Sequence, residues 1–281
     1  MRYPKAIRKL TWSVAGALIL IATALAPAKA DKLQDILNRG YLIIGTSSTN
    51  PPFGYKDEKG ELRGFDIDVS RLMAEALFDD PNKVKFELIS LEARWSSLQT
   101  DKVDAIVMIT TILPNRLKRV AFTPPYVDSG MAVLVRKDTN IKHLADFNNE
   151  SVTIATLTVP EQIDLAKQYV SKAKIVSFEA VDQQFLALKS KRAQGMEVDL
   201  PLGMWYAAQD PDMYLLPELF NGYQNYAIAY KLGELTWKQF LDGFVTELTT
   251  GSNYFEYEKI YQKYFKRSPP PQRFYKIDAA Q

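Results

Sequence analysis

The strongest constraint on the fold is an alternation of short apolar runs with segments of helical period. Tyr41–Gly45 and Asp104–Ile109 are almost continuously apolar, as expected of strands that are covered on both faces. Between them, apolar residues recur every three or four positions from Val69 to Ala76, which predicts one buried face of a helix. This alternation indicates α/β layers around a mainly parallel sheet.

The same pattern restarts in the second half of the chain. Ser151–Leu157 is predicted to be a strand and Glu161–Val170 a helix. Further strands are predicted at Ala132–Lys137, before the pattern restarts, and after it at Lys174–Phe178, Met196–Leu202 and Tyr226–Lys231. Two amphipathic helices follow, and the second carries a stripe of aromatic residues that we expect to pack into the core. The second α/β unit is therefore expected to be inserted before these last helices.

The first thirty residues have the organisation of a secretory signal. Basic residues precede an apolar stretch from Leu10 to Leu25, and Ala28-Lys29-Ala30 supplies small residues at the cleavage site. An uncleaved membrane anchor is the alternative, but the stretch is short and carries Thr11, Ser13 and Thr23. We therefore expect residues 1–30 to be removed, which makes Asp31 the mature N-terminus.

Charge and cysteine content limit the compartment and the partners. Five of the 35 basic residues lie in the predicted signal, so the mature chain has 30 basic against 33 acidic residues. This balance predicts no binding of nucleic acid. The chain has no Cys, which excludes both disulfides and a lipid anchor on an N-terminal Cys. The bacterial periplasm fits these features.

The composition also disfavours several kinds of catalysis. With no Cys and a single His, His143, a Ser-His-Asp or Cys-His arrangement would need that one residue. A zinc site built on histidines is not expected either. We therefore predict no enzyme activity, no cofactor and no metal, although catalysis by carboxylates stays open.

The order of motifs in the mature chain resembles the family-3 periplasmic solute-binding proteins, the polar amino acid receptors of ABC uptake systems. No single motif is specific, but their order and spacing together are. The motifs are Gly45-Thr46, Pro52-Phe53, Gly64-Phe65-Asp66-Ile67-Asp68, Val103-Asp104-Ala105, Arg116 with Phe122-Thr123 six residues on and Pro125-Tyr126 after it, Val198-Asp199, and Tyr257 to Phe265.

The resemblance implies a type II fold with two lobes that close over a ligand. It places strand crossings near Val135-Arg136 and from Gly222 to Tyr226. Residues 31–134 and 227–281 would form the first lobe, and 135–226 the second. Hinge closure around a small carboxylate-bearing ligand would then be read by a membrane permease of the ABC type. The receptor itself is expected to be a monomer.

The resemblance also implies which residues hold the ligand. Arg116 matches the position that grips the ligand carboxylate, for which a planar guanidinium is well suited. Thr111 and Thr158 match hydroxyl positions that bond the ligand. Thr158 and Glu161 also form a capping-box pattern, which predicts that Thr158 caps the following helix.

Other positions of the implied site depart from the family pattern. Asn50 and Leu91 stand where aromatic residues are usual, with Trp95 one turn further on, and Met204 aligns with the acid that holds the ligand ammonium. The remaining positions expected around the ligand are Phe53 and Ile109. Since a thioether cannot balance a charge, the ligand is predicted to lack a free α-ammonium, unless another acid such as Asp182 replaces Met204.

Two other functions are compatible with such a scaffold. One is an accessory protein that binds a protein partner in a periplasmic system. The other is a periplasmic enzyme of the dehydratase type.

Overall fold

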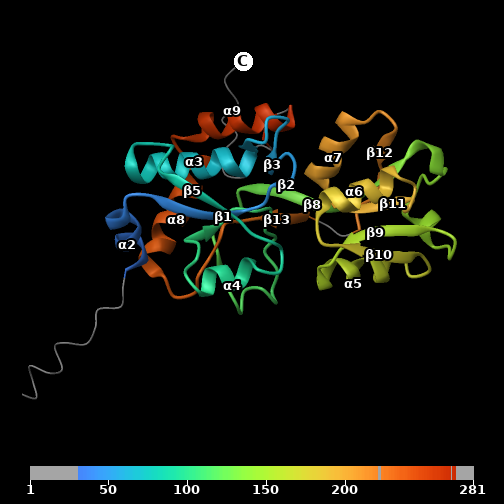
Figure 1. Cartoon of the computed structure of the whole chain (residues 1–281), viewed down its shortest axis with the longest axis horizontal. Coiled ribbons are helices and arrows are strands. Elements are labelled where there is room, and N and C mark those ends of the chain that lie inside the picture. Colours follow the sequence, from blue (N-terminus) through green and yellow to red (C-terminus); the bar gives the residue numbers. More distant parts are fainter. Residues whose placement is uncertain (1–30, 221–222, 267, 270–281) are drawn as a thin grey trace, which may run out of the picture.

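The computed structural model describes residues 31–220, 223–266 and 268–269. Two lobes, each built around its own β-sheet, lie side by side along the long axis (Figure 1). The predicted signal, residues 1–30, lies outside the described residues. No helix within the described residues is both long enough and apolar enough to cross a membrane. The two-lobed α/β fold expected from the sequence is confirmed.

A five-stranded sheet forms the centre of the first lobe. Its strands are β1 (Leu42–Thr46), β5 (Val84–Leu88), β6 (Ala105–Ile106), β7 (Ala121–Phe122) and β14 (Ala229–Tyr230). Their order is β5-β1-β6-β14-β7. β1 pairs in parallel with β5 and β6, whereas β14 runs antiparallel to β6 and β7.

Helices and a small antiparallel sheet surround this centre. They are α2 (Lys32–Arg39), α3 (Phe65–Phe78), α4 (Arg94–Gln99), α8 (Leu235–Thr250), α9 (Tyr254–Phe265), β2 (Thr49–Asn50), β3 (Gly54–Lys56) and β4 (Leu62–Arg63). The aromatic stripe of α9 is part of the core, as predicted: Tyr257 and Tyr261 are buried and contact the Phe65 ring edge-on.

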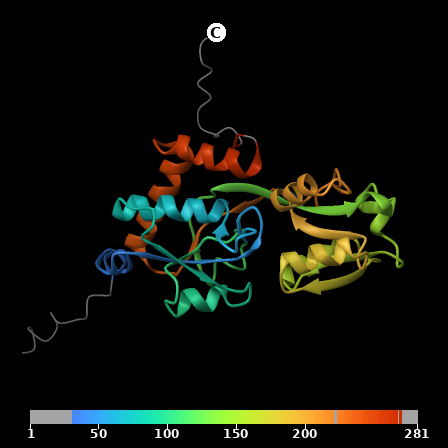
Figure 2. The same ribbon diagram turned by 45° about the horizontal axis from the view of Figure 1, so that its top comes forward.

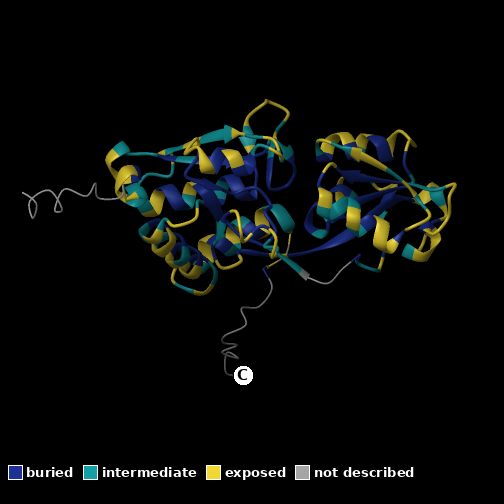
Figure 3. Cartoon of the chain, turned by 90° about the horizontal axis from the view of Figure 1, so that it is seen from below, coloured by how far each residue is buried: buried dark blue, intermediate teal, exposed yellow. Residues whose placement is uncertain are grey.

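The second lobe has its own mixed sheet. Its strands are β8 (Val127–Arg136), β9 (Thr153–Leu157), β10 (Lys174–Phe178), β11 (Gly195–Asp199) and β12 (Met213–Leu215), in the order β10-β9-β11-β8-β12. Helices α5 (Pro160–Tyr169), α6 (Val181–Lys189) and α7 (Leu200–Gln209) pack on it, and short 3-10 helices lie at Lys137–Thr139 and Leu144–Phe147. Figure 3 shows buried residues gathered inside each lobe.

Two antiparallel strands connect the lobes, β8 and β13 (Tyr223–Tyr226). β13 pairs with Val127–Gly130, and the rest of β8 pairs with β11 and β12 of the second sheet. Figure 2 shows β8, in green, running from one lobe into the other. The first crossing therefore lies earlier than predicted, because Val135 and Arg136 already belong to the second sheet, and the expected boundary at 134/135 falls inside β8. The polar residues at 128–129 interrupt the apolar pattern, so the sequence did not predict that β8 begins at Val127.

Two other strand predictions also need correction. The strand predicted at Met196–Leu202 ends at Asp199, and α7 begins at Leu200. Pro201 lies in the first turn of that helix, where a missing N–H costs nothing. The strand predicted at Tyr226–Lys231 is divided between the end of β13 and β14. In both places an apolar run continues across an element boundary, so the period alone could not find the boundary.

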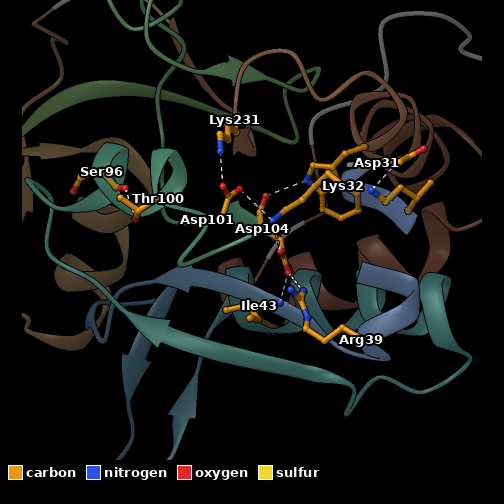
Figure 4. Close-up of polar contacts among 11 residues, drawn as sticks. Asp31, Lys32, Arg39, Ile43, Ser96, Thr100, Asp101, Asp104 and Lys231 are labelled. Atoms are coloured by element: carbon orange, nitrogen blue, oxygen red, sulfur yellow. Dashed lines mark hydrogen bonds and ion pairs between the residues drawn. The ribbon is translucent and has the colours of Figure 1, made fainter. Parts of the chain in front are cut away.

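A buried carboxylate fixes the N-terminal helix to the first lobe (Figure 4). The Asp104 side chain is fully buried, lies 3.0 Å from Lys32 Nζ, pairs with Arg39 and accepts a hydrogen bond from the Ile43 N–H at 2.8 Å. The exposed neighbour Asp101 pairs with Lys32 and Lys231. The contacts of Asp104 alone link α2, β1 and the turn before β6.

Candidate functional site

A small cavity with about 50 Å³ of free space lies between the lobes and opens to solvent. A position between two lobes is a usual place for a small-molecule site. Both lobes and the crossing strand β13 supply its walls. The lining residues are Leu91, Arg94, Ile109, Thr111, Leu113, Arg116, Met131, Leu157, Val159, Glu161, Gln162, Leu165, Asp199 and Gln224.

Arg116 brings a buried guanidinium to this cavity. It follows a turn in which its N–H bonds the carbonyl of Leu113, and it is 7% exposed. Its Nη1 donates to the Thr111 carbonyl at 3.1 Å, which fixes the side chain. Burial lowers the pKa of Arg116, with Glu161 acting in the opposite direction, yet the group stays charged at neutral pH.

A second guanidinium, that of Arg94, lies close to the first. Arg94 begins α4 and lies over the ring of Trp95, 4.5 Å from its centroid, where a cation–π contact holds it. Burial and repulsion by Arg116 lower the pKa of Arg94 to about 9. The Nε atoms of both arginines are buried and have no hydrogen-bond partner among the described residues. Two such donors at one cavity favour an anionic ligand.

An acid faces these arginines from the second lobe. Asp199 ends β11 and hydrogen-bonds the Tyr226 side chain on the crossing strand β13. The Tyr226 hydroxyl also accepts a hydrogen bond from Ser129 Oγ at 3.0 Å. The two strands that connect the lobes, β8 and β13, therefore fix the position of the Asp199 carboxyl. Burial raises the pKa of Asp199 to about 6. At neutral pH this carboxylate can therefore pair with a cation in the cavity.

The backbone that carries Ile109 and Thr111 into the cavity is held by another buried acid. Ile109 adopts a φ of 40°, a value that is strained for a β-branched residue. Its N–H donates to Asp66 at 3.1 Å, and the Tyr126 hydroxyl donates to the same carboxyl at 2.7 Å. Asp66 thereby fixes the segment that contains Thr111, whose carbonyl accepts the hydrogen bond from Arg116.

Comparison with known proteins decides the family. The model of bacterial extracellular solute-binding proteins, family 3, matches residues 42–267. The chain belongs to this family.

Relatives of this solute-binding protein share its length and its fold. The ABC transporter glutamine-binding protein of Bacillus subtilis is 26% identical over 243 residues, 86% of this chain and 87% of the relative. The L-glutamate/L-aspartate-binding protein of Pseudomonas aeruginosa is 26% identical over 272 residues, 92% and 89% of the two chains. The crystal structure of the cysteine-binding protein from Campylobacter jejuni superposes with a TM-score of 0.77 at 29% identity, covering 89% of this chain and 98% of that one.

Four of the residues predicted for this solute-binding protein line the interlobe cavity, namely Arg116, Thr111, Leu91 and Ile109. Two others, Trp95 and Thr158, line a second cavity beside it that shares Arg94 and Glu161 with the first. Thr158 does not cap α5: the N-cap is Val159, which has no side-chain hydrogen bond. The capping box fails because the helix begins one residue later than the pattern indicates.

The other three predicted residues lie away from both cavities. Asn50 is buried in β2, and Phe53 is fully buried against Phe65 and Tyr226. Met204 lies on α7, one turn beyond the end of β11. Asp199, five residues earlier, is an acid that does line the cavity, so a ligand with a free α-ammonium would meet a carboxylate there. Asp182, the alternative acid, is exposed and lines neither cavity.

Sequence reasoning missed Arg94, Asp199 and Glu161 as site residues. Asp199 carried a signal, since an acid that ends a buried strand comes at an edge of the sheet where sites form. Arg94 carried none, because the sequence gives no sign that this particular arginine is buried.

Proposed function

We propose that this protein is the periplasmic receptor of an ABC uptake system for an acidic amino acid. The observation that carries the proposal is the pair of buried guanidiniums whose Nε atoms have no hydrogen-bond partner in the described chain, opposite a buried carboxyl. Such a site complements a molecule with two anionic groups and one cationic group.

Each end of the ligand has its own partner. Arg116 binds the α-carboxylate through its N–H donors, and Thr111 lies beside it. Asp199 holds the α-ammonium, which could not otherwise enter a closed cleft without a large desolvation cost. Arg94 binds the carboxylate of the ligand side chain. The exposed Thr158 contributes only at the mouth of the cleft, beside the second cavity.

The relatives support an amino acid as the ligand. Their names specify glutamine, glutamate or aspartate, and cysteine. An acidic side chain is favoured here because Arg94 adds a second buried cation to the cavity. The protein releases its ligand chemically unchanged, because the family consists of solute-binding proteins.

The remaining features concern transport. Residues 1–30 direct export to the periplasm and are then removed. Closure of the lobes about β8 and β13 presents a shape that the permease recognises. The receptor acts as a monomer and binds no nucleic acid.

The test compares L-glutamate and L-glutamine by calorimetry on the mature protein. L-glutamate should bind at least about tenfold tighter, because a charge-assisted hydrogen bond contributes about 1.5–3 kcal/mol. In the Arg94→Gln variant this preference should disappear while L-glutamine still binds. Tighter binding of L-glutamine to the wild type would reject the acidic ligand, and failure of all amino acids would reject the receptor.

A further inference from the structure

Glu161 makes direct contacts between the two lobes. It lies in the first turn of α5, in the second lobe, and its side chain is 31% exposed. Its Oε1 accepts a hydrogen bond from Asn115 Nδ2 at 2.8 Å and lies 3.5 Å from Arg116 Nε. Both partners belong to the first lobe. A single carboxylate therefore bridges the cleft.

The donor that Glu161 faces is one that a ligand carboxylate needs. Nη1 of Arg116 is already used by the Thr111 carbonyl. Nε lies 3.5 Å from Glu161 Oε1, at ion-pair distance but without hydrogen-bond geometry, and has no hydrogen-bond partner in the described chain. A ligand carboxylate that binds the edge of the guanidinium formed by Nε and Nη2 must meet Glu161 there. Two anions cannot share that donor without repulsion.

The surrounding charges make this position attractive for an anion. Glu161 and Arg94 line both cavities of the cleft, so Glu161 lies in the field of two guanidiniums. Asp199 is the opposing acid in the main cavity. Glu161 differs from Asp199 because its side chain is partly exposed to water, whereas Asp199 is buried.

We propose that Glu161 is an internal competitor for the anion site. In the ligand-free protein its carboxylate pairs with Arg116 from the opposite lobe, holds the cleft partly closed and lowers the affinity for carboxylate ligands. The proposal rests on the proposed function for the identity of the ligand, but not for the state of the free protein. Glu161 thereby sets the concentration range in which the receptor responds.

The test is the Glu161→Gln variant, which keeps an oxygen for Asn115 and removes the charge. We expect L-glutamate to bind at least about threefold tighter than to the wild type, since a partly exposed ion pair is lost from the free protein. Asp164→Asn is the matched control, an acid-to-amide change on the same helix at a side chain that is 77% exposed. It should leave the affinity unchanged.

Small-angle X-ray scattering of the ligand-free proteins supplies a second measurement. Glu161→Gln should have a larger radius of gyration than the wild type, whereas Asp164→Asn should not. Weaker binding by Glu161→Gln would mean that Glu161 touches the ligand, and an unchanged radius would mean that it does not close the cleft; either result overturns the proposal. If L-glutamate binds none of the proteins, the proposed function fails, and the scattering alone decides the role of Glu161.

Discussion

Arg116 and Asp199 reach the same cavity from opposite lobes, the first from a turn after β6 and the second from the end of β11. The positive charge of Arg116 lowers the pKa of Asp199, but the larger effect of burial raises it. This pair gives the cleft one site for an anion and one for a cation. Because each lobe supplies one member, a zwitterion would bind both only when the cleft is closed.

The Arg116→Ala variant should lose amino acid binding while the protein still folds. Two charge-assisted hydrogen bonds would disappear, so the affinity for L-glutamate should fall at least about a hundredfold. Calorimetry measures the loss, and Arg71→Ala, at an arginine whose side chain is 44% exposed, is the control. A loss below about tenfold would remove Arg116 from the binding site.

Binding should depend on pH through Asp199. Its pKa in the free protein is about 6, and the ligand ammonium favours the ionised form. Affinity therefore rises as the pH increases through about 6, with about a tenfold gain between pH 5 and 7.5. In Asp199→Asn the affinity should be low and the gain absent. If that variant keeps the gain, another group is responsible for it.

The sequence predicted the fold because apolar runs and helical periods locate strands and helices. Arg116 was inferred from the family resemblance, through its spacing to Phe122 and Tyr126, and the structure places it at the cavity. Asp199 was missed because its role depends on where β11 ends, and the apolar residues of α7 continue the strand pattern past that point. Arg94 and Glu161 were missed because a cavity between two lobes joins residues that no local pattern relates.

Asp104 should be far more important for stability than its neighbour Asp101. Asp104→Asn leaves Lys32 and Arg39 without their buried partner, which should cost about 3 kcal/mol of unfolding free energy. Asp101→Asn alters pairs at a side chain that is 48% exposed, and should cost less than about 1 kcal/mol. Urea denaturation compares the two variants. Equal losses would show that the buried network does not fix α2.

The mature protein should begin at Asp31. The Asp31 side chain accepts hydrogen bonds from the N–H groups of Leu33 and Gln34 and so caps α2. Cleavage after Ala30 keeps this cap. Intact mass spectrometry of the exported protein should give the mass of residues 31–281. A mass that includes residues 1–30 would contradict the predicted signal cleavage.

The most direct test of the two-ended site is a calorimetric comparison of L-glutamate with α-ketoglutarate on the mature protein at pH 7.5. The two ligands share both carboxylates and differ in the α-ammonium that Asp199 is proposed to hold. We predict that L-glutamate binds at least about tenfold tighter, because the ionised carboxylate otherwise stays unpaired beside the ligand. Equal affinity, or tighter binding of α-ketoglutarate, would contradict the assignment of Asp199 as the ammonium partner.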